Sequence, residues 1–114
     1  MHPLRLIAAL IATAAVPVQA QTTTNPVTTV FGQPDCGEWV RNTRQPDRAW
    51  LLGYLSGMNK IHNATGGKSN DPLNALNSAD QAYLWMDNWC KENPLKKVGA
   101  GAMDLFIELM TTKR

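Results

Sequence analysis

The sequence holds few of the residues that bind metals or act as nucleophiles. Its 114 residues include two histidines and two cysteines. His2 lies at the extreme N-terminus, so His62 is the single histidine of the body, and we expect it to be solvated at a helix end. Metal sites need several His, Cys or carboxylate ligands, and a nucleophile needs a base beside it. We therefore predict no catalytic residue, metal or cofactor, and we expect that the protein is not an enzyme.

Two other catalytic patterns are present only in part. Gly67-Lys68-Ser69 resembles the end of a phosphate-binding loop, but His62 stands where that motif needs its first glycine. Two pairs of acidic residues, Asp80 with Asp87 and Asp104 with Glu108, could form the carboxylate pair of a glycoside hydrolase. We expect instead that they solvate the outer faces of helices, so neither pattern predicts an enzyme.

Clusters of positive charge are also missing. The 11 Lys and Arg residues are offset by 9 Asp and Glu, and they do not gather into a stripe. Binding to nucleic acids or to anionic membranes depends on clustered Lys and Arg. We therefore predict no nucleic-acid partner.

The one long apolar run is too short to span a membrane. Leu6–Val16 is uncharged, whereas a membrane-spanning helix needs about 20 apolar residues. Arg5 precedes this run, and Val18 and Ala20 are the small residues that signal peptidase requires before its cut. Residues 1–20 are therefore predicted to be a cleaved signal peptide, and the processed protein is predicted to be periplasmic and not membrane-bound.

Both cysteines, Cys36 and Cys90, fall in the exported part of the chain. Thiols that reach an oxidising compartment generally pair, so a Cys36–Cys90 disulfide is predicted. Closing the segment between them would stabilise the fold by about 4 kcal/mol on the chain-entropy model. That value is comparable with the net stability of a small domain.

The exported part divides into an arm and a body. Residues 21–34 are rich in Thr, Asn, Pro and Gln and lack a helical period, which predicts a flexible arm. Residues 35–114 are long enough for one domain. The longest polar segment of this body is the loop from Thr65 to Asn77.

Capping residues and breakers bound four predicted helices in the body. Asp35 is a good N-cap with Glu38 three residues later, and Ser78 with Gln81 forms a second capping box. Apolar residues recur at helical spacing between these signals. The helices are expected from Cys36 to the break at Gln45-Pro46, from Pro46-Asp47 to Gly66-Gly67, from Ser78 to Asn93-Pro94, and from about Lys96 to Met110. The predicted fold is all-α, a small four-helix bundle with one disulfide.

Two features of the predicted helices bear on packing and binding. Ala49, Gly53 and Gly57 stand four apart on the second helix, which leaves a groove for another helix. Either this groove packs inside the monomer or it forms a homodimer contact. Tryptophans dominate many protein interfaces. Most of the four in this chain are expected in the core, and at least one is expected at a rim beside the polar loop. They are Trp39, Trp50, Trp85 and Trp89.

Three segments of the body read CGEWV at 36–40, WLLGYLSGMN at 50–59 and WMDNWCKENPL at 85–95, and the pair Glu108-Leu109 follows. Together these residues resemble the Rap/Tai family of type VI secretion immunity proteins. The resemblance spans roughly Cys36 to Leu109 and implies a small periplasmic helical protein, often dimeric. It also implies a partner, a peptidoglycan amidase injected by neighbouring cells, whose Cys-His cleft the protein would occlude.

A binding role of this kind needs a protruding element on a rigid body. The polar loop offers Lys68, Ser69, Asn70 and Asp71, which are the predicted partner-binding residues because loops carry function when a scaffold positions them. Two alternatives stay open. One is a periplasmic acid-stress chaperone of the HdeA type, and the other is an exclusion factor that acts on the envelope.

The signal peptide gives the first testable prediction. When the full chain is produced in a bacterium with a general secretory pathway, the protein recovered from the periplasm should begin at Gln21, because Ala20 and Val18 define the cut. N-terminal sequencing checks this. Recovery of the chain with Met1 or Arg5 still attached would contradict it.

Overall fold

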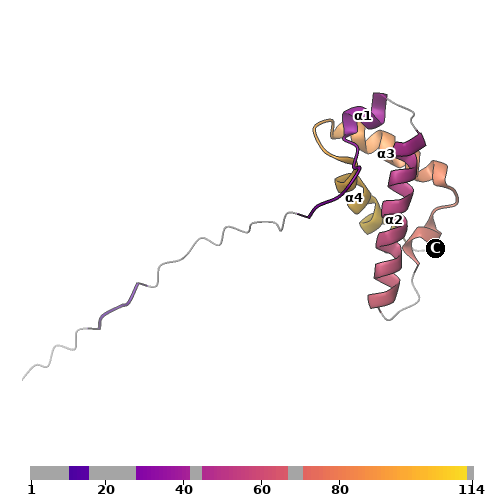
Figure 1. Ribbon diagram of the computed structural model, residues 1–114. Coiled ribbons are helices and arrows are strands. Elements are labelled where there is room, and N and C mark those ends of the chain that lie inside the picture. The colour runs from indigo at the N-terminus through magenta and orange to yellow at the C-terminus, as the bar shows by residue number, and fades with distance from the viewer. Residues whose placement is uncertain (1–10, 16–27, 42–44, 67–70, 113–114) are drawn as a thin grey trace, which may run out of the picture.

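The computed structural model of the protein describes residues 11–15, 28–41, 45–66 and 71–112. These residues form four α-helices and one short 3-10 helix, and their β structure is limited to one isolated bridge between Asp35 and Lys97. The all-α prediction is confirmed (Figure 1). The elements are α1 (Cys36–Arg41), α2 (Gln45–Thr65), η1 (Pro72–Ala75), α3 (Ala79–Glu92) and α4 (Val98–Thr111).

The start of α1 follows the sequence prediction. The Asp35 carboxylate accepts a hydrogen bond of 2.7 Å from the backbone N–H of Glu38, which satisfies one free donor of the first turn. The helix is short, and only Cys36 and Trp39 are buried on it. It packs against α3.

The second capping box is wrong in detail. Ser78 stands at the N-cap of α3 with extended backbone, but its side chain makes no capping bond. Gln81 instead accepts a 2.8 Å hydrogen bond from the backbone N–H of Asn77, one residue earlier than predicted. The helix nevertheless begins after Ser78, as expected. Its apolar stripe of Ala82, Met86 and Cys90 is buried, and this packing stabilises the helix without the capping bond.

The helix α4 is the centre of the bundle. It packs against α2, α3 and η1. The predicted apolar stripe is confirmed as a buried face, which consists of Val98, Ala102, Leu105, Phe106 and Leu109. Gly101 is also buried, and a Cβ there would lie 2.6 Å from Cε3 of Trp89, so α3 and α4 approach at van der Waals contact. A larger residue at position 101 would push these two helices apart.

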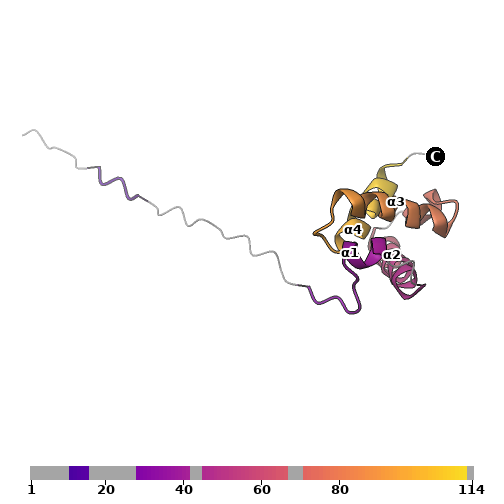
Figure 2. The same cartoon turned by 90° about the horizontal axis from the view of Figure 1, so that it is seen from above.

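The predicted disulfide is confirmed. Cys36 and Cys90 are bonded, with their Cα atoms 4.9 Å apart and both residues buried. The bond joins the start of α1 to the end of α3. Figure 1 and Figure 2 show α1 at one end of the bundle, beside the loop between α3 and α4.

The chain before α1 is joined to the same end. Of the predicted signal peptide and arm, residues 11–15 and 28–34 are described, and the rest lies outside the described residues. Gln33 accepts a 2.8 Å hydrogen bond from the backbone N–H of Gly99, and the carbonyl of Pro34 accepts one of 3.0 Å from Val98. The last two residues of the expected arm therefore pack on α4.

Removal of the disulfide should destabilise the bundle strongly. The double variant Cys36→Ala/Cys90→Ala should lose about 4 kcal/mol of unfolding free energy, because the unfolded chain regains the conformations that the closed loop forbids. Urea denaturation followed by tryptophan fluorescence measures this. A loss below about 1 kcal/mol would show that the cross-link adds little to the packing of α1 on α3.

Candidate functional site

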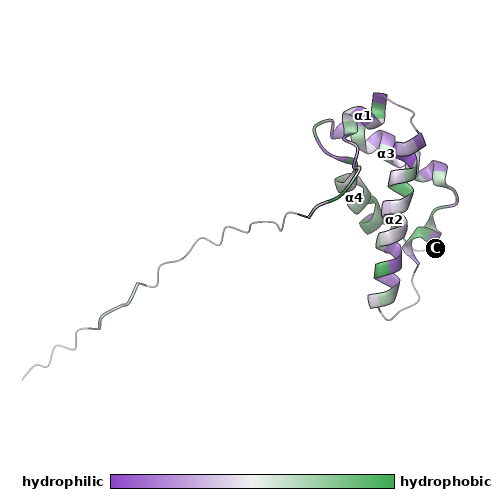
Figure 3. Cartoon of the chain, in the orientation of Figure 1, coloured by the Kyte–Doolittle hydropathy of each residue, from purple (hydrophilic) through white to green (hydrophobic). Residues whose placement is uncertain are grey.

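A mostly apolar groove lies between α2 and α4. It has a volume of about 680 Å³. The two glycines Gly53 and Gly57 form part of its α2 wall, and α4 supplies the other wall. In Figure 3 much of the α4 ribbon has the green tint of hydrophobic residues. The remaining lining residues are Tyr54, Met58, Ile61, His62, Met103, Phe106 and Met110.

The small-residue face of α2 is open to solvent. Ala49, Gly53 and Gly57 are all exposed, and a Cβ placed on either glycine would meet nothing within 4 Å. The interpretation that these residues pack inside the monomer is therefore wrong. The homodimer contact remains a prediction.

His62 lies in the last turn of α2, as the sequence predicts, but it is not fully solvated. It is half-buried, and its ring packs edge-on against Phe106 with the ring centroids 5.7 Å apart. The residues that line the groove around it include no carboxylate and no cysteine. His62 thus serves as part of an apolar wall.

All four tryptophans lie in or against the hydrophobic core, as expected for most of them. Only Trp39 is fully buried, and the other three are half-buried. Each indole N–H donates a hydrogen bond, so the rings are held in fixed orientations. The acceptors are Asp87 for Trp39, the carbonyl of Phe31 for Trp50, Glu108 for Trp85 and Asp104 for Trp89.

These contacts also correct the expected role of three acidic residues. Asp87, Asp104 and Glu108 do not merely solvate outer helix faces, because each accepts an indole N–H from a neighbouring helix. The carboxylates thereby fix α1 to α3 and α3 to α4. Among the residues that the structure describes, no group of three His, Cys, Asp or Glu could hold a metal ion.

Only one of the four predicted partner-binding residues can be placed. Lys68, Ser69 and Asn70 lie outside the described residues. Asp71 is exposed, and its carboxylate accepts a 2.7 Å hydrogen bond from the amide of Asn59 on α2. The end of the predicted binding loop is therefore anchored to the middle of α2.

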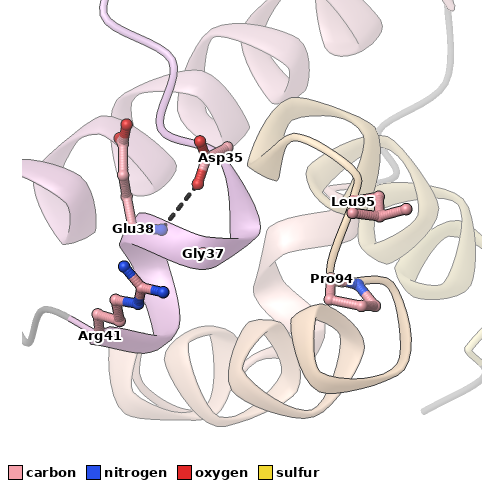
Figure 4. Close-up of a pocket in the computed structure, with 6 residues that line it drawn as sticks. All are labelled: Asp35, Gly37, Glu38, Arg41, Pro94 and Leu95. Atoms are coloured by element: carbon pink, nitrogen blue, oxygen red, sulfur yellow. Dashed lines mark hydrogen bonds between the residues drawn. The ribbon is translucent and has the colours of Figure 1, made fainter.

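The turn between α3 and α4 is a second surface feature, which sequence reasoning missed. It carries Leu95, whose side chain is 98% exposed. A shallow groove of about 470 Å³ separates Pro94 and Leu95 from α1 (Figure 4). The α1 side of this groove consists of Asp35, Gly37, Glu38 and Arg41. No periodic pattern marks an exposed leucine in a turn, so the sequence contained no signal for it.

Comparison with known proteins found no match. No protein-family model, no curated protein and no solved structure matches the chain. None of the described helices combines the length and apolarity needed to cross a membrane.

Glycine substitutions should separate open surface from tight packing. Gly53→Ala and Gly57→Ala should each raise the unfolding free energy by about 0.5–1 kcal/mol, because alanine favours a helix and no neighbour obstructs its methyl group. Gly101→Ala should instead lower the unfolding free energy by about 1–3 kcal/mol, because the methyl group would overlap Trp89. Urea denaturation of the three variants measures both effects.

Changes in unfolding free energy of the opposite sign would contradict this prediction. Destabilisation by Ala at positions 53 and 57 would mean that the exposed face of α2 is covered in the native protein. Equal values for all three variants would contradict the close approach of α3 to α4.

Proposed function

We propose that this chain is an exported immunity protein that binds a peptidoglycan amidase and blocks the Cys-His cleft of that enzyme by occupying it. The observation that carries the proposal is the exposure of large apolar side chains on ordered elements. Leu95, Ile61 and Leu84 are 98%, 65% and 61% exposed. Apolar side chains at such positions add little to a fold but can contribute strongly to an interface.

The second support is rigidity. Binding costs less free energy when the binding surface is ordered beforehand, since fewer side chains and loops lose freedom in the complex. Here a disulfide, a buried central helix and fixed tryptophan rings hold the bundle. A steric inhibitor must be rigid, because the substrate could displace a protein that changes its shape easily.

The compartment is consistent with this role. Peptidoglycan and the enzymes that cleave it lie outside the cytoplasmic membrane, and an inhibitor must meet the enzyme there. The signal-peptide pattern of residues 1–20 predicts export. The Cys36–Cys90 disulfide fits an oxidising periplasm.

The predicted contact residues Lys68, Ser69, Asn70 and Asp71 belong to this proposal. The Asp71 carboxylate accepts a hydrogen bond from the side-chain amide of Asn59, which holds the residue before η1 against α2. Replacement of all four residues by alanine tests the loop directly. Unchanged binding of the amidase would exclude it as the inhibitory surface.

Affinity capture tests the proposed function. The processed protein is purified in oxidised form from the periplasm of a producing strain and immobilised, and secreted and periplasmic fractions are passed over it at neutral pH. We expect stoichiometric retention of one papain-like peptidoglycan amidase, identified by mass spectrometry. Addition of the soluble protein should then stop that enzyme from releasing peptides from peptidoglycan.

Other outcomes would contradict the proposal. Retention of many unrelated proteins only after acidification would point to an acid-stress chaperone. An amidase that is retained but keeps its full activity would show binding without inhibition, and the immunity proposal would then be wrong.

A further inference from the structure

We propose that a small pocket between α1, α2 and α3 receives an aspartate or glutamate side chain of the partner amidase, and that Arg48 binds the carboxylate of that side chain. This inference rests on the proposed function and names one contact by which the partner is recognised. The pocket has a volume of about 150 Å³ and lies where the three helices meet (Figure 1). Its lining residues are Trp39 and Val40 on α1, Arg48 on α2, and Asp87 and Lys91 on α3.

The head group of Arg48 is held in place in the free protein. Its Cζ atom lies 4.8 Å from the ring centroid of Tyr83, a cation–π contact that joins α2 to α3. The arginine is half-buried, as is the tyrosine. Because the guanidinium is already ordered, less conformational entropy is lost when it binds a ligand.

The two cationic groups of the pocket are free to bind an anion. Within the part of the chain that the structure describes, neither Arg48 nor Lys91 forms an ion pair with a carboxylate. A guanidinium presents its N–H donors in one plane, which matches the two oxygens of a carboxylate. The ammonium of Lys91 adds a second positive charge from α3. The pocket therefore has the donors that recognise an oxyanion.

Asp87 limits the charge that the pocket accepts. Its carboxylate accepts a 2.8 Å hydrogen bond from the indole N–H of Trp39, so it is fixed in the wall. Arg48 and Lys91 each contribute one positive charge and Asp87 contributes one negative charge, which leaves a single positive charge in excess. A carboxylate, with one negative charge, balances this excess. A phosphate group carries close to two negative charges at neutral pH and would not be balanced.

The apolar lining favours a carboxylate on a short hydrocarbon stem. Trp39 and Val40 supply apolar surface beside the cations. Val40 is 48% exposed, so it gains burial only when a partner covers it. The methylene groups of an aspartate or glutamate would pack against these two residues while the carboxylate reaches Arg48.

The size of the pocket indicates a side chain of a larger partner rather than a free small molecule. Sites for small-molecule ligands usually have volumes of about 300–1,000 Å³, and this pocket is smaller. A free carboxylate of a few atoms would bind with a Kd of roughly 1 mM, because so small a ligand makes few contacts. The same contact becomes effective inside an extended interface, where Trp, Tyr and Arg contribute most of the binding energy.

The chemistry of the pocket is tested on the processed protein without the amidase. Sodium acetate replaces sodium chloride at constant ionic strength and neutral pH, and the indole N–H signals are followed by NMR. We expect a saturable shift of the Trp39 signal, because this indole lines the pocket. Arg48→Ala should abolish the shift. The signals of Trp50, Trp85 and Trp89 are internal controls that should not move.

Two results of this titration would overturn the carboxylate site. One is an unmoved Trp39 signal, or a shift of equal size in the parent and in Arg48→Ala. The other comes from a parallel titration with inorganic phosphate. Tighter binding of phosphate than of acetate would contradict the choice of a monoanion.

Binding to the amidase retained by affinity capture tests the partner. Calorimetry with the full processed protein should show that Arg48→Ala weakens binding about tenfold to hundredfold. Arg48→Lys keeps the charge but loses the planar donors, so it should recover only part of the affinity. Lys60→Ala removes an exposed cation of α2 outside the pocket and should bind like the parent protein.

A further variant separates binding from folding. Arg48→Ala also loses the contact with Tyr83, so the melting temperature of each variant is measured by circular dichroism. Lys91 is exposed and makes no such contact. Lys91→Glu should therefore keep the parent melting temperature and still weaken binding of the amidase.

The outcomes distinguish this inference from the proposed function. If the parent protein does not bind the amidase, the proposed function is wrong and the partner named here falls with it, while the acetate titration still decides the chemistry of the pocket. If the parent protein inhibits the amidase and both Arg48→Ala and Lys91→Glu bind it equally well, the immunity function stands and the pocket is not a contact.

Discussion

The cross-link between Cys36 and Cys90 is the constraint on which the rest of the structure depends. It fixes the start of α1 against the end of α3 at one end of the bundle. Backbone hydrogen bonds beside it attach Cys36 to Lys96 and Pro34 to Val98. Two segments that are distant in sequence, residues 34–36 and 90–98, therefore meet at this end. Because α1 is only six residues long, packing alone would hold it weakly, and the covalent bond compensates.

The central helix α4 explains how a small chain builds a core around this end. Its buried stripe packs against α2, α3 and η1 together. Two carboxylates on α4 accept hydrogen bonds from indole N–H groups on α3. Asp104 accepts from Trp89, and Glu108 accepts from Trp85. Within the described ranges no polar or charged residue is fully buried. Three carboxylates of the bundle, those of Asp87, Asp104 and Glu108, thus serve as hydrogen-bond partners for tryptophans. One carboxylate oxygen of Asp47 on α2 is the exception among the described residues, because it is buried without a hydrogen-bond partner.

Local signals in the sequence predicted the helices well, and contacts between distant residues limited the prediction of the site. The apolar spacing in α4 and the cap at Asp35 depend on neighbours within one turn, so both could be recognised from the chain alone. The disulfide followed from having only two cysteines in the predicted exported region. In contrast, the contact of His62 with Phe106 joins residues 44 positions apart, and no local pattern encodes it. The open face at Gly53 and Gly57 was ambiguous for the same reason, since small residues suit either a packed or an exposed helix face.

The turn between α3 and α4 shows that the cross-link acts beyond the core. This turn begins three residues after Cys90, and the carbonyl of Lys96 within it accepts a hydrogen bond from the N–H of Cys36, the other half of the disulfide. The bond that joins α1 to α3 therefore also holds this turn against α1, although Leu95 at its tip is 98% exposed and contributes nothing to the core.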